Sequence, residues 1–188
     1  MWKRFALRKI EAFERQFGYD ARYMKELLKT SPSAFLKLSR LQAISAFRRG
    51  VPLEAWYAAK LVGALAEDCG PCAQLVVDMA RTHGVPLEGL KAVAEGRESD
   101  MADEVRLAFR YARAAVSREP TDELRFEVVQ RWGPEGHVSL ALALFSGRVY
   151  PILKYALGHG QSCSRLRFDD ASRTVVVHAH AEPRARMS

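Results

Sequence analysis

Helix-length segments with regularly spaced apolar residues fill most of this 188-residue chain, and Gly or Pro separates one segment from the next. Phe5, Ile10, Phe13 and Phe17 roughly follow one face of a first segment, which Gly18 ends. The pattern predicts an all-α protein. Further helices are expected to begin near Asp20, Ser31, Pro52, Cys69, Pro86, Ser99 or Asp100, Thr121 and Pro134.

The pattern changes after Gly158. Residues 165–168 alternate between basic and apolar, residues 169–172 resemble a turn, and residues 174–177 are mostly β-branched. This indicates a short C-terminal β-hairpin, which must pack on the helices or on another subunit because an isolated hairpin is marginal in water. We therefore expect an N-terminal helical extension over 1–30, a helical domain over 31–160, and a hairpin with a polar tail over 161–188.

Composition excludes several classes of protein. The chain is 48% hydrophobic and 27% charged, so it can bury an ordinary core without a metal or disulfide to hold it together. The longest apolar stretch, residues 138–146, is far shorter than the roughly 20 residues that span a bilayer. No uninterrupted apolar region follows the basic start of the chain, so we expect no signal peptide, no membrane association and a cytoplasmic location.

The net charge is +7, and the surplus lies at the two ends. Residues 1–50 carry 12 basic and 4 acidic side chains, whereas residues 51–100 carry 4 and 8. A basic run of this kind is usually a solvated helix face. Because no series of aromatic residues alternates with arginine, we expect no nucleic-acid partner.

The sharpest motif is Cys69-Gly70-Pro71-Cys72, at the start of a predicted helix. In such a pair one thiol can attack and the other can resolve the intermediate, and unpaired N–H groups at a helix start lower a thiol pKa. Glu67 and Asp68 directly precede the pair. Their negative charge disfavours a thiolate, but the two carboxylates are also candidates for moving its proton.

Three interpretations of the pair compete. The first is thiol–disulfide or peroxide chemistry, which the absence of an export signal and the odd number of cysteines favour. The second is half of a zinc site completed by His159 and Cys163, although the two long flanking helices are untypical of a zinc knuckle. The third is a pair of small buried residues at a helix junction. We expect the first, with no resident metal and, since no phosphate-binding glycine loop occurs, no organic cofactor.

The tetrapeptide also matches the thioredoxin active site, but no hydrophobic strand or βαβ pattern precedes it. From about Ser31 to Gly160 the order of segments instead resembles the AhpD-like, or carboxymuconolactone decarboxylase-like, family. An Ala-rich helix ends in Glu-Asp-Cys-Gly-Pro-Cys, the next helix closes at His83-Gly84-Val85-Pro86, and a helix around residues 108–112 and a long last helix follow.

This resemblance implies an all-helical protein that assembles as a homo-oligomer, commonly a trimer or hexamer. It implies an alkylhydroperoxidase or disulfide reductase in which Cys72 attacks the peroxide and Cys69 resolves the sulfenic acid. A dithiol partner, such as a lipoyl protein or thioredoxin, would then reduce the pair.

The chain departs from the family at two relay positions. The family has a His four residues after the second Cys and a Glu twelve residues before the first, and here these positions are Val76 and Tyr57. His83 shares the helix face of Cys72 but lies about 16 Å along the axis, too far for contact. We therefore expect Glu67 or Asp68 to serve the pair, since general-base help is typically worth 10²–10⁴-fold in rate.

Two alternatives remain at this point. The fold could be a non-enzymatic oligomeric scaffold or a small-molecule binder in which the pair is a structural or regulatory disulfide. Decarboxylation of a muconolactone-type acid is a weaker third possibility, because the family's decarboxylases do not depend on a C-x-x-C motif.

Overall fold

Helices make up most of the computed structural model, which describes residues 1–160, 165–168 and 174–176. The prediction of an all-α protein is confirmed. In chain order the helices are α1 (Trp2–Phe17), α2 (Arg22–Thr30), α3 (Pro32–Ser39), α4 (Leu41–Ser45), α5 (Leu53–Ala66), α6 (Gly70–Thr82), α7 (Leu87–Glu95), the 3₁₀ turn η1 (Glu98–Asp100), α8 (Asp103–Ser117) and α9 (Asp122–Ala156).

Several helix ends follow the expected local chemistry. Gly18 ends α1 in the left-handed conformation with φ 58°, which glycine adopts without steric cost. Ser31 caps α3, since its Oγ accepts a hydrogen bond from the backbone N–H of Ala34 at 3.4 Å, and Pro32 is the first helical residue.

Other boundaries differ from the expectation. The segment that follows Ser31 divides at Arg40 into two short helices. Among the apolar residues spaced three apart along it, only Phe35 is buried, and the others are half-buried: Leu38, Leu41, Ile44 and Phe47. The helix expected to begin at Cys69 begins at Gly70, and Cys69 is its N-cap. Asp68, one residue earlier, has a positive φ of 49°. The helix expected at Ser99 or Asp100 begins instead at Asp103, because residues 98–100 form a 3₁₀ turn.

The long helix α9 unites the last two expected helices. Gly133 has φ 73° and ψ 175°, which marks a break between them at the predicted place. Helical structure continues past Pro151 to Ala156.

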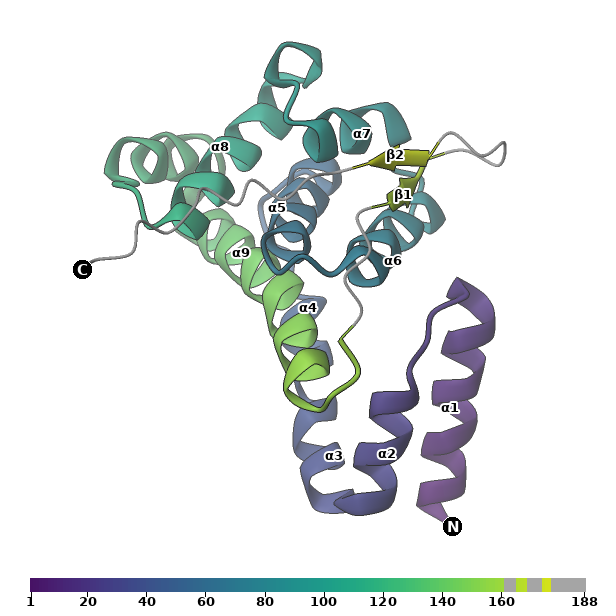
Figure 1. Cartoon of the computed structure of the whole chain (residues 1–188). Coiled ribbons are helices and arrows are strands. Elements are labelled where there is room, and N and C mark those ends of the chain that lie inside the picture. The colour runs from purple at the N-terminus through teal and green to yellow at the C-terminus, as the bar shows by residue number, and fades with distance from the viewer. Residues whose placement is uncertain (161–164, 169–173, 177–188) are drawn as a thin grey trace, which may run out of the picture.

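The main core surrounds α5, whose residues 55–64 are all buried. Helices α6, α7, α8 and α9 pack against it (Figure 1). Helices α5 and α9 approach each other closely at two glycines: the Cα atom of Gly147 lies 3.3 Å from the point where a Cβ of Gly63 would be. A helix that is buried on every side needs such small residues, because its neighbours leave no room for larger ones.

A second core lies at the N-terminal end of the molecule, where α1, α2 and α3 run side by side (Figure 1). Its buried residues come from these helices, from the α1–α2 turn and from the start of α6. They are Ile10, Tyr19, Ala21, Tyr23, Leu28, Phe35, Cys69 and Cys72. The N-terminal helices therefore share a core with the cysteine pair.

Two short strands, β1 (Arg165–Arg167) and β2 (Thr174–Val176), pair antiparallel with Leu166 opposite Val175. Leu166 and Phe168 are buried in the main core, where β1 contacts α6. Residues 169–173 and the tail from residue 177 lie outside the described residues, so the expected hairpin and tail stay predictions. Within the described part of the chain, no helix has the length and apolarity needed to cross a membrane.

Candidate active site

Cys69 and Cys72 are joined by a disulfide at the start of α6, with their Cα atoms 5.3 Å apart. Cys69 is the N-cap and Cys72 is the third helical residue. Pro71 suits its place between them, because the first-turn N–H that proline lacks would have no partner within the helix. Both cysteines are buried, with exposed fractions of 1% and 5%.

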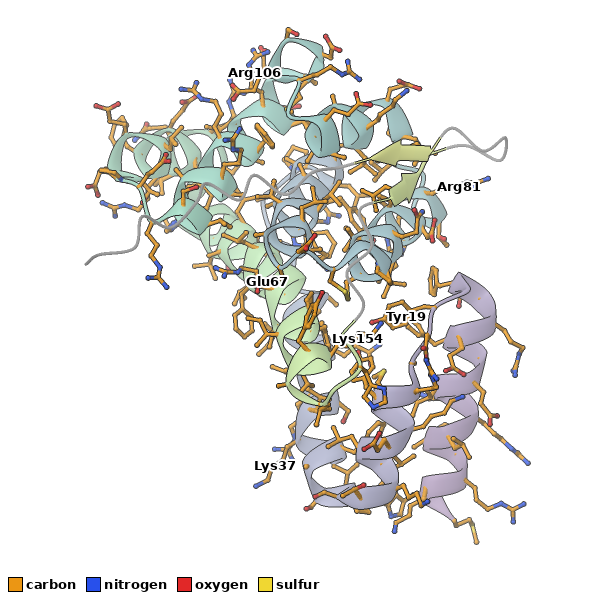
Figure 2. The ribbon with its side chains drawn as sticks, viewed as in Figure 1. Tyr19, Lys37, Glu67, Arg81, Arg106 and Lys154 are labelled. Atoms are coloured by element: carbon orange, nitrogen blue, oxygen red, sulfur yellow. A yellow bond between two sulfur atoms is a disulfide. The ribbon has the colours of Figure 1, made fainter. Side chains whose placement is uncertain are left out.

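Tyr19 covers the pair from the turn between α1 and α2. Its hydroxyl lies 3.7 Å from Cys72 Sγ, and its ring packs edge-on against Phe13 of α1. Lys154 of α9 places its ammonium 4.8 Å from the centre of the Tyr19 ring. Figure 2 shows Tyr19 and Lys154 facing each other between the N-terminal helices and the end of α9. A tyrosine hydroxyl thus lies beside the disulfide, and a buried ammonium lies over the ring of that tyrosine.

Burial governs the ionisation of these groups. It raises the pKa of Tyr19 to about 12 and also raises the pKa of Tyr23, the next buried tyrosine. Burial lowers the pKa of Lys154, while the carboxylate of Asp20 opposes that shift. Both phenols are therefore protonated at neutral pH and available as hydrogen-bond donors.

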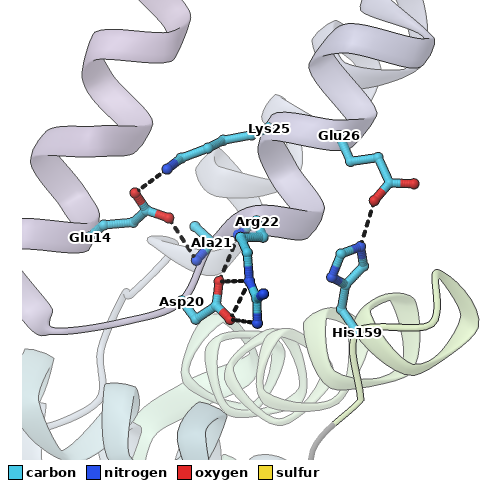
Figure 3. A network of polar contacts seen from close by, with 7 residues as sticks. All are labelled: Glu14, Asp20, Ala21, Arg22, Lys25, Glu26 and His159. Atoms are coloured by element: carbon cyan, nitrogen blue, oxygen red, sulfur yellow. Dashed lines mark hydrogen bonds and ion pairs between the residues drawn. The ribbon is translucent and has the colours of Figure 1, made fainter.

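A polar network fixes the turn that carries Tyr19 (Figure 3). Glu14 accepts a hydrogen bond from the backbone N–H of Ala21 at 3.1 Å and pairs with Lys25 at 2.5 Å. Asp20 pairs with Arg22 at 2.7 Å, which lowers the pKa of the Asp20 carboxyl. The turn is thus held from both sides.

A further contact ties α2 to the segment that follows α9. His159 Nε2 lies 2.7 Å from a carboxylate oxygen of Glu26 (Figure 3). Together with the shared core, this contact fixes the N-terminal helices against the rest of the molecule.

The two acidic candidates from the sequence analysis have other contacts. Glu67 is half-buried and accepts a hydrogen bond from Arg148 Nε at 2.5 Å. Asp68 is exposed, and its backbone carbonyl accepts a hydrogen bond from the Tyr155 hydroxyl at 3.2 Å. Arg148 contacts only one carboxylate oxygen of Glu67, Oε1, and the role of both carboxylates stays a prediction.

The two positions that depart from the family pattern lie in the main core. Val76 is buried there with Tyr57, which is fully buried on α5. The hydroxyl of Tyr57 lies 2.5 Å from Nδ1 of His83, at the far end of α6. Val76 and Tyr57 therefore supply neither the imidazole nor the carboxylate that the family pattern has at these positions. His83, the nearest imidazole in sequence, pairs with Tyr57.

The zinc interpretation gains no support from the described residues. No group of three or more His, Cys, Asp and Glu side chains among them could hold a metal ion. His159 pairs with Glu26, and the proposed fourth ligand, Cys163, lies outside the described residues.

The contact of Tyr19 with Cys72, and that of Lys154 with Tyr19, were not predicted. Tyr19 follows the glycine that ends α1, so it belongs to no helical face and has no periodic signal. Lys154 is in the sequence one of many basic residues, and only its 2% exposure distinguishes it. An aromatic residue directly after a helix-ending glycine was the available signal, because such a ring in a turn tends to pack back on its own helices.

Comparison of the chain with protein-family models, with curated proteins and with solved structures gives no match.

Proposed function

We propose that this protein is a thiol-dependent oxidoreductase of the alkylhydroperoxidase or disulfide-reductase type, acting through Cys69 and Cys72. The observation that carries the proposal is the disulfide between the N-cap and the third residue of α6, with a buried tyrosine hydroxyl beside one sulfur. The free N–H groups of a first helical turn favour a thiolate there, and a thiolate is the reactive form of cysteine.

The peroxide reaction balances with a dithiol as reductant. The Cys72 thiolate attacks one peroxide oxygen, the O–O bond breaks, and the alkoxide takes a proton from water, which leaves a sulfenic acid and an alcohol. The Cys69 thiol then attacks the Cys72 sulfur, water leaves, and the disulfide forms. A dithiol partner returns both thiols and becomes a disulfide itself.

The proposal includes the family resemblance and the partners that it implies. These are an AhpD-like arrangement of helices over residues 31–160, a lipoyl or thioredoxin-like reductant, and a homo-oligomer such as a trimer or hexamer. Exposed large apolar side chains late in α9 support an oligomer, because a second copy would remove them from water. They are Phe145, Ile152 and Tyr155.

A second candidate function rests on the burial of the pair. Both cysteines lie within the core that joins the N-terminal helices to α6. A disulfide in that place could be structural or regulatory in a non-enzymatic scaffold. The closure of so short a loop would stabilise the fold by about 2 kcal/mol.

A Cys72→Ser variant separates the two candidates, with Cys163→Ser as the matched control. Turnover of an organic hydroperoxide with a dithiol reductant is measured alongside urea unfolding of the oxidised and the reduced proteins. An enzyme loses more than about 100-fold in turnover in Cys72→Ser and keeps it in Cys163→Ser. A wild type without turnover, whose unfolding midpoint falls on reduction of the pair, supports the scaffold.

A further inference from the structure

The Tyr19 hydroxyl lies within hydrogen-bond distance of Cys72 Sγ, at 3.7 Å, in a site where both groups are buried. Tyr19 comes from the N-terminal extension and Cys72 from α6, 53 residues later. The contact therefore depends on the tertiary packing of the extension. It also places a hydroxyl group beside the sulfur that the proposed mechanism makes nucleophilic.

We propose that Tyr19 is a catalytic residue that donates its hydroxyl hydrogen bond to the Cys72 thiolate, and that Lys154 is a positioning residue that holds the phenol ring. This inference rests on the thiol chemistry proposed above. It assigns the stabilisation of the thiolate to a residue from the extension, where the resembled family uses a histidine on the helix of the cysteines.

The surroundings of Tyr19 suit a donor. The Tyr19 hydroxyl is the donor in its contact with Cys72, because Cys72 is in a disulfide and its sulfur carries no hydrogen. The Lys154 ammonium lies over the ring, where its charge is attracted to the aromatic face. Rotation of the ring away from Cys72 would break both contacts.

The chemistry of the step follows from charge. Once the pair is reduced, a hydrogen bond to the anionic sulfur stabilises the thiolate relative to the thiol and lowers the Cys72 pKa. Tyr19 keeps its proton throughout, since burial holds its pKa at about 12. The alkoxide that leaves the peroxide still takes its proton from water, so the balance of the reaction is unchanged.

Other charged and titratable groups near this contact come from four elements. Cys69 caps α6, and Asp20 neighbours Tyr19 in the turn. Tyr23 lies on α2. Lys154 and Tyr150 lie on α9, and Tyr150 contributes to the raised pKa of Tyr23. The carboxylate of Asp20 opposes a thiolate and the Lys154 ammonium favours one. Because these groups remain in a Tyr19→Phe variant, the variant isolates the hydroxyl.

The test is the pH dependence of iodoacetamide alkylation of the reduced full-length protein, with the Cys69 and Cys72 peptides resolved by mass spectrometry. Tyr19→Phe is expected to raise the Cys72 pKa by about one to two units, since a hydrogen bond to a charged group is worth that much. At a pH below the wild-type Cys72 pKa, alkylation of Cys72 then slows by up to roughly 10- to 100-fold, with a smaller change at Cys69.

Tyr111→Phe is the matched control. It removes another buried tyrosine hydroxyl, which lies 2.9 Å from Nε2 of His137 in the main core, and should leave both cysteine pKa values unchanged. Lys154→Met keeps the length of the side chain and should raise the Cys72 pKa by less than Tyr19→Phe does. An unchanged Cys72 pKa in a folded Tyr19→Phe protein overturns the inference.

If Tyr19→Phe does not fold, replacement of Tyr19 by 3-fluorotyrosine preserves its shape and strengthens the donor. The Cys72 pKa should then fall, and no change would contradict the inference. The readout needs no turnover. If Tyr19→Phe raises the Cys72 pKa but the wild type reduces no peroxide or disulfide, only the proposed function is refuted. If the wild type is an active enzyme but Tyr19→Phe leaves the Cys72 pKa unchanged, only this inference is refuted.

Discussion

At the scale of one residue, Lys60 is a basic side chain buried in the main core, and its ammonium has specific partners there. It is 5% exposed on the buried helix α5, with its ammonium 3.7 Å from the centre of the Trp56 ring. The ammonium also donates a hydrogen bond to the carbonyl of Ser45 at 2.6 Å, which occupies a free acceptor at the end of α4. Burial lowers the Lys60 pKa to about 7. The native state therefore holds this proton less tightly than the unfolded chain does.

The lowered pKa of Lys60 predicts a pH dependence of stability. Between pH 7 and the unfolded pKa near 10.5, the unfolded state binds more protons, so the contribution of this group to the free energy of unfolding rises with pH. Relative to Lys60→Met, the wild type should gain on the order of 2 kcal/mol between pH 7 and pH 9. Urea unfolding of both proteins at each pH measures this difference. Parallel pH profiles would show that Lys60 keeps an ordinary pKa.

The contact between α5 and α9 decides the architecture at the scale of elements. Gly63 on α5 and Gly147 on α9 face each other, and a Cβ on Gly147 would meet the backbone carbonyl of Lys60 and lie 3.0 Å from the amide of Ala64. Because backbone atoms cannot rotate out of the way as a side chain can, the two helices would have to separate.

Gly147→Ala is therefore expected to destabilise the protein by about 3 kcal/mol or more, despite the better helix propensity of alanine. Thermal or urea unfolding measures the change. Gly89→Ala on α7 is the matched control, since a Cβ there meets nothing within 4 Å. The control should be neutral or stabilising by up to about 1 kcal/mol. Equal stability of the two variants would mean that the helices do not approach so closely.

At the scale of the whole molecule, the N-terminal helices cover the disulfide. Phe13 packs against Tyr19, Tyr19 contacts Cys72, and the contact of His159 with Glu26 holds α2 near the end of α9. A bulky dithiol protein can reach the buried sulfurs only after this cover opens. Local opening of a few helices costs less than global unfolding, so it can occur in the native state.

Weakening the cover should therefore accelerate reduction of the pair. Phe13→Ala removes ring contacts with Phe17 and Tyr19, and a loss of about 1–2 kcal/mol in closure would raise the reduction rate by a reduced dithiol protein roughly 5- to 30-fold. Phe5→Ala is the control, since Phe5 is 62% exposed on the same helix. Unchanged reduction in a measurably destabilised Phe13→Ala protein would show that the pair is reached without opening.

Most of the helices could be predicted because their signals are local. The end of α1 is marked by the left-handed conformation of Gly18. The start of α3 is marked by the capping hydrogen bond of Ser31 and by Pro32. The division of the segment after Ser31 could not be predicted, since its apolar spacing is uniform and no glycine or proline marks the break at Arg40. The Cys69–Cys72 pair could likewise be predicted from its motif, whereas its burial could not.

The sequence by itself determined the all-α class, most helix boundaries and the position of the cysteine pair at a helix start, because periodicity, caps and short motifs act over a few residues. Only the tertiary structure decided which groups surround the pair. It brought Tyr19 to Cys72 across 53 residues, placed Lys154 over the Tyr19 ring and paired Glu67 with Arg148. These contacts join distant segments through burial and charge, and no local pattern in the chain encodes them.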